Sequence, residues 1–310
     1  MQTLDSPSLP SVSSSDVTEP KLQTPNPKPS SPSPSVIRLW RPAAQRNLRN
    51  QWSKLVPLKQ QWVSASSSGR SHATFLVNAH LSERYMPAMN LGVLSDMPNI
   101  REKAIQKLAQ QQKLHRVRLL SSYKDMVVVV SHMVNVSSSM RSFVKGPTSS
   151  PFVQFSSHSE ENNDNGDGGG IPVFKFCSIP YFESLAKELV QMFGLELILK
   201  RMLLVELLPI NCEESPQQTD ALSWSNELYP GEFDDLTACN LYSEQTCEPV
   251  PPRINGWKSD DQITKRANVR PDQKALEVYL TTWLQEVKID TLRVDEIFAI
   301  VGEEMQMRLV

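Results

Sequence analysis

The sequence predicts a mainly α-helical protein, with a long amphipathic helix, a helical C-terminal body, a disordered Ser/Pro-rich N-terminus and acidic linkers. Apolar residues recur at spacings of three and four along residues 105–143 and again near the C-terminus, which is the period of a helix. The 23 prolines, 11 glycines and 39% hydrophobic content indicate that part of the chain lies outside a packed core.

Charge is divided unevenly along the chain, although the net charge is only −2. Residues 20–82 contain nine basic residues and no Asp or Glu, whereas residues 175–310 contain 23 acidic and 13 basic residues. A cationic front and an anionic back favour an acidic or nucleic-acid partner at the N-terminal side.

The four cysteines form no C-x-x-C pair, so neither a zinc module nor a disulfide framework is predicted. We expect reduced thiols in a soluble, intracellular protein without a cofactor. No stretch approaches the roughly 18 apolar residues of a membrane span, and no membrane partner is expected.

Residues 1–35 contain ten Ser and eight Pro and no aromatic residue, which predicts a disordered tail. Residues 36–95 form a basic arm that carries tryptophans. In this arm Pro42 suits the first turn of a short amphipathic helix, and the apolar stripe of that helix stops at Pro57. The Ser-rich run 63–70 is expected to be a loop, followed by a second short helix.

The basic arm supplies the candidate binding residues. A basic amphipathic helix with tryptophans can bind a protein groove, a membrane surface or nucleic-acid phosphates. The alternative is that its tryptophans pack on the protein's own domain. The candidates are Arg38, Trp40, Arg41, Arg46, Arg49, Trp52, Lys54 and Lys59.

The apolar spacing within residues 96–145 predicts a helix of about 45 residues, with Ser95 or Asp96 as its N-cap. A helix of this length should pair in part with another helix. A buried strand over 126–130 is the alternative, because Val127 begins a β-branched run. The seam positions are Ile105, Leu108, Gln112, His115, Leu119, Ser122, Met126, Val129, Met133, Val136, Met140 and Phe143.

The remaining segments alternate between linker and helix. Residues 146–170 are expected to be a flexible acidic linker, whose GDGGG run lacks the lysine and hydroxyl of a phosphate-binding loop. Residues 171–310 form an acidic helical region: a helix of about 30 residues after Ser178, a loop over 211–269, and two helices after Pro271 and Asp290 that should form an antiparallel hairpin.

No short catalytic motif emerges from the sequence. It contains no nucleophile elbow, no H-E-x-x-H spacing and no phosphoryl-transfer loop, and its five histidines are widely separated. At the seam position of His115, a partly solvated interhelical histidine is favoured over a catalytic one. We therefore expect a protein that is not an enzyme and has no metal site.

Two blocks, HRVRLLSSYKDMVVVVSHMVNVSSSMRSF from His115 to Phe143 and GDGGGIPVF from Gly166 to Phe174, resemble a plant-specific family required for meiotic DNA double-strand break formation. The resemblance extends from about Ile37 to the C-terminus. It implies a nuclear accessory factor in recombination that does not cut DNA itself, and it supplies no catalytic residues.

The functional hypothesis is a nuclear scaffold that contacts other proteins through its helices and DNA or an acidic partner through the basic arm. The alternative is a spindle- or cytoskeleton-associated helical subunit, because a basic arm would also suit an acidic filament.

Overall fold

The computed structural model describes residues 34–145, 152–155, 165–210, 222–252 and 271–309, and within them the mainly α-helical fold is confirmed. The predicted disordered tail falls outside these residues except at 34 and 35. The α-helices are α1 (Pro34–Tyr85), α2 (Ile100–Ser138), α3 (Ile179–Leu207), α4 (Glu232–Ala238), α5 (Gln273–Gln285) and α6 (Thr291–Met305).

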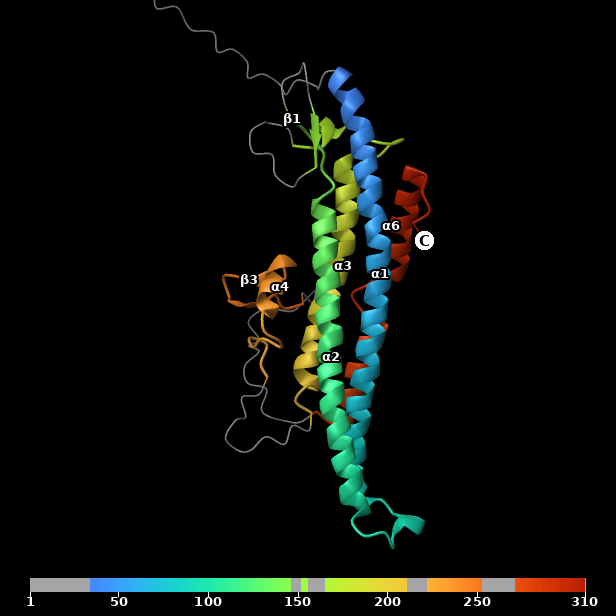
Figure 1. Ribbon diagram of the computed structural model, residues 1–310, viewed down its shortest axis with the longest axis vertical. Helices are drawn as coiled ribbons and strands as arrows, with labels where there is room; N and C mark the ends of the chain where they lie inside the picture. Colours follow the sequence, from blue (N-terminus) through green and yellow to red (C-terminus); the bar gives the residue numbers. More distant parts are fainter. Residues whose placement is uncertain (1–33, 146–151, 156–164, 211–221, 253–270, 310) are drawn as a thin grey trace, which may run out of the picture.

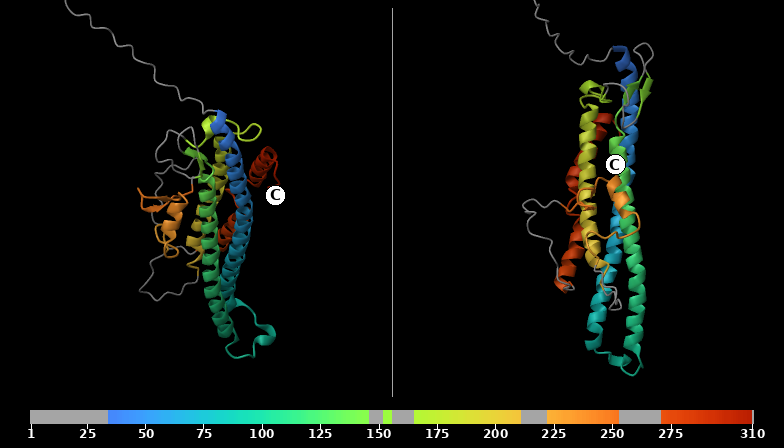
Figure 2. Two further views of the ribbon diagram at one scale, coloured as in Figure 1. Left: turned by 45° about the horizontal axis from the view of Figure 1, so that its top comes forward. Right: turned by 90° about the vertical axis from the view of Figure 1, so that its left-hand side faces the viewer.

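The long helices form an elongated bundle (Figures 1 and 2). Helices α1 and α2 make an antiparallel hairpin, joined by a connection with two short 3-10 turns, η1 (Met86–Ala88) and η2 (Gly92–Leu94). Helix α3 lies against α2 and runs back in the opposite direction. Helices α5 and α6 follow one another along α1 and together take the fourth position of the bundle.

The predicted hairpin of the two C-terminal helices is wrong. Trp283 of α5 donates its indole N–H to the Ser66 carbonyl, and Asp295 of α6 lies beside Lys59. Both helices therefore run antiparallel to α1, one after the other. Each has one apolar stripe, and α1 and α3 cover that stripe more completely than two short helices could cover each other.

Helix α1 is continuous, whereas the sequence predicted two short helices and a loop. Pro42 and Pro57 lie inside the helix but on its exposed side. The carbonyl groups that each proline leaves without a helical partner can thus be solvated, which lowers the cost of an interior proline.

The Ser-rich run 63–70 is helical because it packs against α5. A Cβ atom at Gly69 would stand 2.6 Å from Cζ2 of Trp283, and Ser66 is buried beside the same indole. Small residues here let a tryptophan approach the backbone, and this tertiary contact overrides the local preference for a loop.

Helix α2 confirms the helical interpretation of residues 126–130 and the predicted seam. From Gln112 to Phe143 every seam residue is buried except His115, which is half-buried. The predicted ends are wrong: the helix starts after Asn99, in the left-handed conformation with φ 58°, and stops at Ser138.

The chain after α2 forms a small β-hairpin between β1 (Phe143–Lys145) and β2 (Phe152–Gln154), where the sequence predicted the end of a helix and a flexible linker. The GDGGG run packs beside it on α1. A Cβ atom at Gly168, where φ is +68°, would lie 2.1 Å from the Trp40 ring. The run therefore serves close packing, which requires glycine for both space and backbone conformation.

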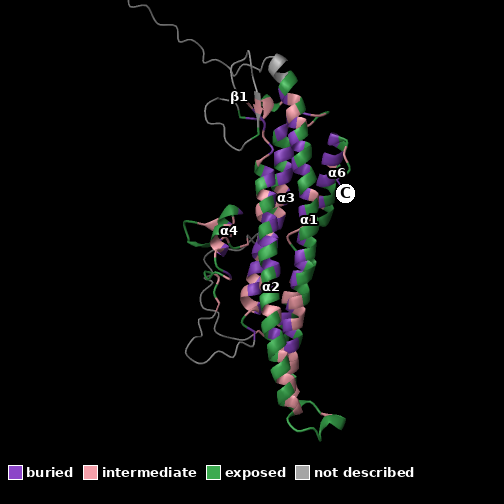
Figure 3. Ribbon diagram, in the orientation of Figure 1, coloured by how far each residue is buried: buried purple, intermediate pink, exposed green. Residues whose placement is uncertain are grey.

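The buried faces of α1, α2 and α3 meet along the middle of the bundle (Figure 3). The segment 222–252, with α4 and the strands β3 (Tyr242–Ser243) and β4 (Glu248–Pro249), covers the outer side of α2 and α3. Burial decreases toward the connection between α1 and α2, where most residues of 86–99 are exposed.

Candidate functional site

The tryptophans of the basic arm are not available to a partner. Trp40 and Trp52 are buried, with exposed fractions of 3% and 0%. The Trp40 indole N–H donates to the Ser142 carbonyl at 2.9 Å, and Trp52 packs edge-on against Phe298 of α6. Their assignment to a binding surface is wrong, because their large apolar area is used to attach α1 to the rest of the bundle.

Three of the candidate cations are also engaged within the protein. Arg41 donates to the Pro172 carbonyl at 3.0 Å. Arg49 donates to the Met305 carbonyl at 3.2 Å, and Lys59 pairs with Asp295 at 2.7 Å. The basic arm thus docks in part on the acidic C-terminal region of its own chain.

Arg38, Arg46 and Lys54 remain exposed along α1. Lys54 donates to Gln51, one turn away on the same helix, at 3.2 Å. Successive members of this trio are eight residues apart, which rotates each about 80° from the one before around the helix. The structure therefore does not gather the eight candidates into one site.

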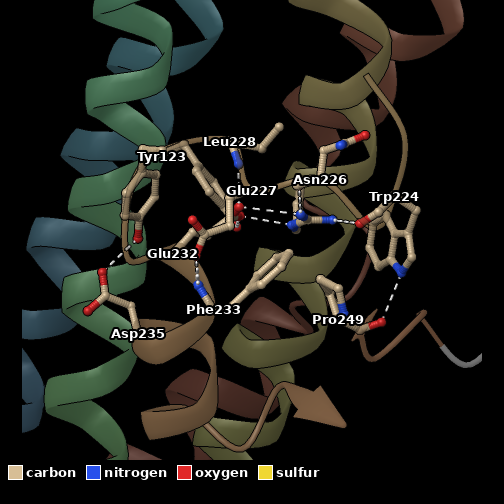
Figure 4. A network of polar contacts seen from close by, with 11 residues as sticks. Tyr123, Trp224, Asn226, Glu227, Leu228, Glu232, Phe233, Asp235 and Pro249 are labelled. Atoms are coloured by element: carbon tan, nitrogen blue, oxygen red, sulfur yellow. Dashed lines mark hydrogen bonds and ion pairs between the residues drawn. The ribbon is translucent and has the colours of Figure 1, made fainter. Parts of the chain in front are cut away.

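A buried polar network joins α2, α3 and the segment 222–252 (Figure 4). The guanidinium of Arg201 donates to both carboxylate oxygens of Glu232, at 2.8 and 3.3 Å. Tyr123 donates its hydroxyl to the same carboxylate at 2.7 Å. Arg201 and Glu232 are fully buried, and the ring of Trp224 lies under the guanidinium.

The network holds its tyrosine in the neutral form. Burial, followed by the charge of Glu232 and the hydrogen bond to it, raises the pKa of Tyr123 well above its usual range. Nearby, burial and then the charge of Asp235 raise the pKa of the Cys239 thiol to about 12. Both groups are therefore protonated at neutral pH, and neither is prepared to act as a nucleophile.

A second buried ion pair lies within α3 and binds backbone groups of α5 and of the chain just after it. Lys200 Nζ lies 2.9 Å from Glu196 Oε1 and donates to the Trp283 carbonyl. The other Glu196 oxygen accepts from the Lys288 backbone N–H at 2.9 Å. Burial is the largest influence here: it raises the pKa of Glu196 and lowers that of Lys200, while their mutual attraction acts in the opposite direction.

Sequence reasoning missed both networks. The periodicity and charge pattern assigned no role to Lys200, Arg201 or Glu232. One signal was available: Lys200 and Arg201 are adjacent cations in the leucine-rich second half of α3, and they require buried partners if the helix is surrounded on all sides.

Two histidines meet where α1 crosses α2. His72 Nδ1 and His115 Nδ1 are 3.1 Å apart, and the Phe75 ring stacks on His115. Both residues are half-buried, so the predicted partly solvated interhelical position of His115 is confirmed. Burial, and then the positive charge of Arg118, lowers the pKa of His72. Burial, the facing histidine and Arg118 lower the pKa of His115.

The distal end of the α1–α2 hairpin, residues 80–117, is covered less than the rest, and none of residues 80–111 is buried. Helix α3 ends at Leu207, next to Arg116, whose guanidinium donates to the Leu208 and Ile210 carbonyls. Past that point α2 is packed mainly on α1 (Figure 1). Exposed apolar residues accumulate here: Tyr85, Met89, Val93, Leu94, Met97, Leu114 and Val117.

Within the described ranges, no group of three or more His, Cys, Asp or Glu side chains could hold a metal ion. In the same part of the chain, no helix combines the length and apolarity needed to cross a membrane.

No protein-family model matches the chain, and no curated protein is similar to it in sequence. The fold and the exposed distal end thus define an elongated helical-bundle protein with a partly uncovered hairpin.

Proposed function

We propose that the protein is a non-enzymatic nuclear scaffold that supports meiotic double-strand break formation through contacts with other proteins. The proposal rests chiefly on the distal end, where a two-helix arm extends past the helices that cover it and exposes apolar side chains. Exposed apolar surface at the end of a rigid arm is typical of a protein interaction site. The process itself is proposed from the resemblance of residues 115–143 and 166–174.

The buried ionisable groups support a scaffold role. Arg201, Glu232 and Lys200 each bind partners from other segments of the same chain. Chemistry on a substrate needs such groups in contact with a ligand, whereas here they fix the relative positions of α2, α3, α5 and the segment 222–252. Rigid positioning of exposed surfaces is what a scaffold requires.

The process is tested in a plant in which the gene is disrupted. Nuclei of meiotic prophase should show far fewer foci of a double-strand-break marker than the wild type, and a tagged wild-type copy should restore them and localise to chromatin. Normal focus numbers would overturn the meiotic proposal. Localisation of the tagged copy to spindle filaments would favour the cytoskeletal alternative.

Contact with DNA phosphates through α1 is a separate part of the proposal, carried by Arg38, Arg46 and Lys54. Replacing these three with Glu in the full chain should abolish retardation of duplex DNA at low salt. For the wild type, log affinity should fall with log salt by about 0.9 per phosphate contacted. The matched control is Lys187→Glu/Lys274→Glu/Arg308→Glu, three exposed cations on other elements. An equal loss of DNA binding in both triple variants would mean that net charge, not this surface of α1, governs binding.

A further inference from the structure

The outer face of α2, defined here by Lys103, Lys107, Lys113, Leu114, Val117 and Arg118, points away from α1. The buried residues of this helix segment, Gln112 and Leu119, lie on its opposite side. Leu114 and Val117 are 47% and 64% exposed, and their spacing of three residues places them side by side on the helix surface.

Cations surround this apolar pair. All four basic residues of the outer face are exposed, and among the described residues none of them forms an ion pair. Residues 100–118 contain six basic side chains, with Glu102 as the single acid. Three of the six candidate cations of α1 differ, because Arg41, Arg49 and Lys59 are bound to carbonyl or carboxylate groups of the same chain.

The interior of the distal end is also incompletely covered. Ile105 and Leu108 occupy seam positions but are only half-buried, unlike the seam residues Leu119 and Met126 further along the helix. Two antiparallel helices cannot enclose an apolar core by themselves, and bundles complete it with a third or fourth helix. A helix docked on the outer face of α2 would bury Leu114 and Val117, whereas the seam residues lie on the opposite side of α2 and would stay half-buried.

We propose that the outer face of α2 is a docking site for an acidic amphipathic helix of a partner protein. Its apolar stripe would cover Leu114 and Val117, and its flanking Glu or Asp residues would meet the lysines on either side, as charged positions do beside a coiled-coil seam. The inference rests on the proposed scaffold function and gives that scaffold a partner of defined chemistry.

Charge and apolarity together favour this occupant over two others. A second copy docked through the same face would place lysines against lysines, which destabilises a symmetric contact. Nucleic acid would pair with the cations but would leave Leu114 and Val117 without an apolar partner, since phosphates carry the affinity of such contacts.

The experiment uses the full chain and a fluorescent synthetic helix about three heptads long, with Leu at the seam positions and Glu on both flanks. Anisotropy should show saturable binding. Leu114→Ser/Val117→Ser should weaken it at least about tenfold, as loss of a central apolar contact does. Lys103→Glu/Lys107→Glu/Lys113→Glu should weaken it by a similar factor at low salt and by less at high salt.

Matched controls are available on other elements. Val278→Ser/Leu292→Ser changes two apolar residues that are 60% and 82% exposed on α5 and α6, and Lys187→Glu/Lys274→Glu/Arg308→Glu changes three exposed cations elsewhere. All variants should unfold at the wild-type temperature, since none removes a buried contact. The control variants should bind the acidic helix like the wild type.

Three results would overturn the docking site. The first is no saturable binding of the acidic helix, and the second is an equal loss of binding in the control variants. The third is that the outer-face variants bind the peptide normally but lose duplex-DNA binding or self-association. The meiotic proposal fails separately. If the peptide binds as expected but break foci are normal without the gene, only that process is wrong. A third outcome is that break formation needs the gene, but a copy carrying Leu114→Ser/Val117→Ser restores the break foci as fully as the wild-type copy. In that case the docking site is not needed for break formation.

Discussion

The two ends of the α1–α2 hairpin differ in what their charged and apolar residues do. Near its open end the hairpin is enclosed by α3, α6 and the chain around 166–177, and Trp40 and Trp52 are buried there. At the distal end Leu114 and Val117 are exposed, although both ends belong to the same two helices. The covering segments, not the helices themselves, decide which residues are free to bind a partner.

The strongest test of this comparison removes a covering contact. Glu232→Ala should lower the free energy of unfolding by about 3–5 kcal/mol, because Arg201 would remain as a buried cation without its carboxylate. Chemical denaturation of the two proteins measures the difference. The control, Glu296→Ala, removes the 58%-exposed partner of Arg293 and should cost about 0–1 kcal/mol. Similar losses in both variants would show that the segment 222–252 does not depend on the buried pair.

The second test compares cores at the two ends. Trp52→Ala empties a fully buried site and should cost about 3–5 kcal/mol. Leu108→Ala at the half-buried distal seam should cost clearly less than the 2–5 kcal/mol typical of a buried leucine. Denaturant midpoints check both values. An equal or larger cost at Leu108 would contradict the incomplete covering of the distal seam.

Local sequence predicts the features of this fold that depend on one helix alone, but not those that depend on the segments that cover it. The seam of α2 was predicted residue by residue because its period reports a single buried face, whatever covers it. The docking of Trp52 on α6 was not predictable, since it depends on residues more than 200 positions away. The Ser-rich turns of α1 were misassigned for the same reason: Trp283, which fits against Gly69, comes from the other end of the chain.

The candidate site was predicted least well, because composition locates charge but not its partners. The segment with the highest positive charge, 20–82, uses Arg41, Arg49 and Lys59 internally. The less conspicuous cations on the outer face of α2 form no ion pair among the described residues. Whether a lysine is available depends on the carbonyl or carboxylate opposite it, and the element that supplies it cannot be identified from local sequence.

The smallest expected effect concerns the histidine contact that joins the covered part of the hairpin to its distal end. The pKa of His72 and of His115 is lowered in the folded protein, so the unfolded chain binds more protons as the pH falls through the ordinary histidine range. The contribution of these two histidines to the free energy of unfolding should therefore be present above about pH 6.5 and should be lost as the pH falls below that value.

His115→Gln removes one of the two titrating rings and keeps a polar side chain that can face His72. Between pH 7.5 and pH 5.5 its free energy of unfolding should change less than that of the wild type, as measured by denaturation at matched salt. His132→Gln, at an exposed position of α2, is the control and should keep the wild-type pH dependence. Because Arg118 also lies in the field of both rings, Arg118→Gln should reduce the pH dependence in part, which would connect the outer face of α2 to the stability of the distal end.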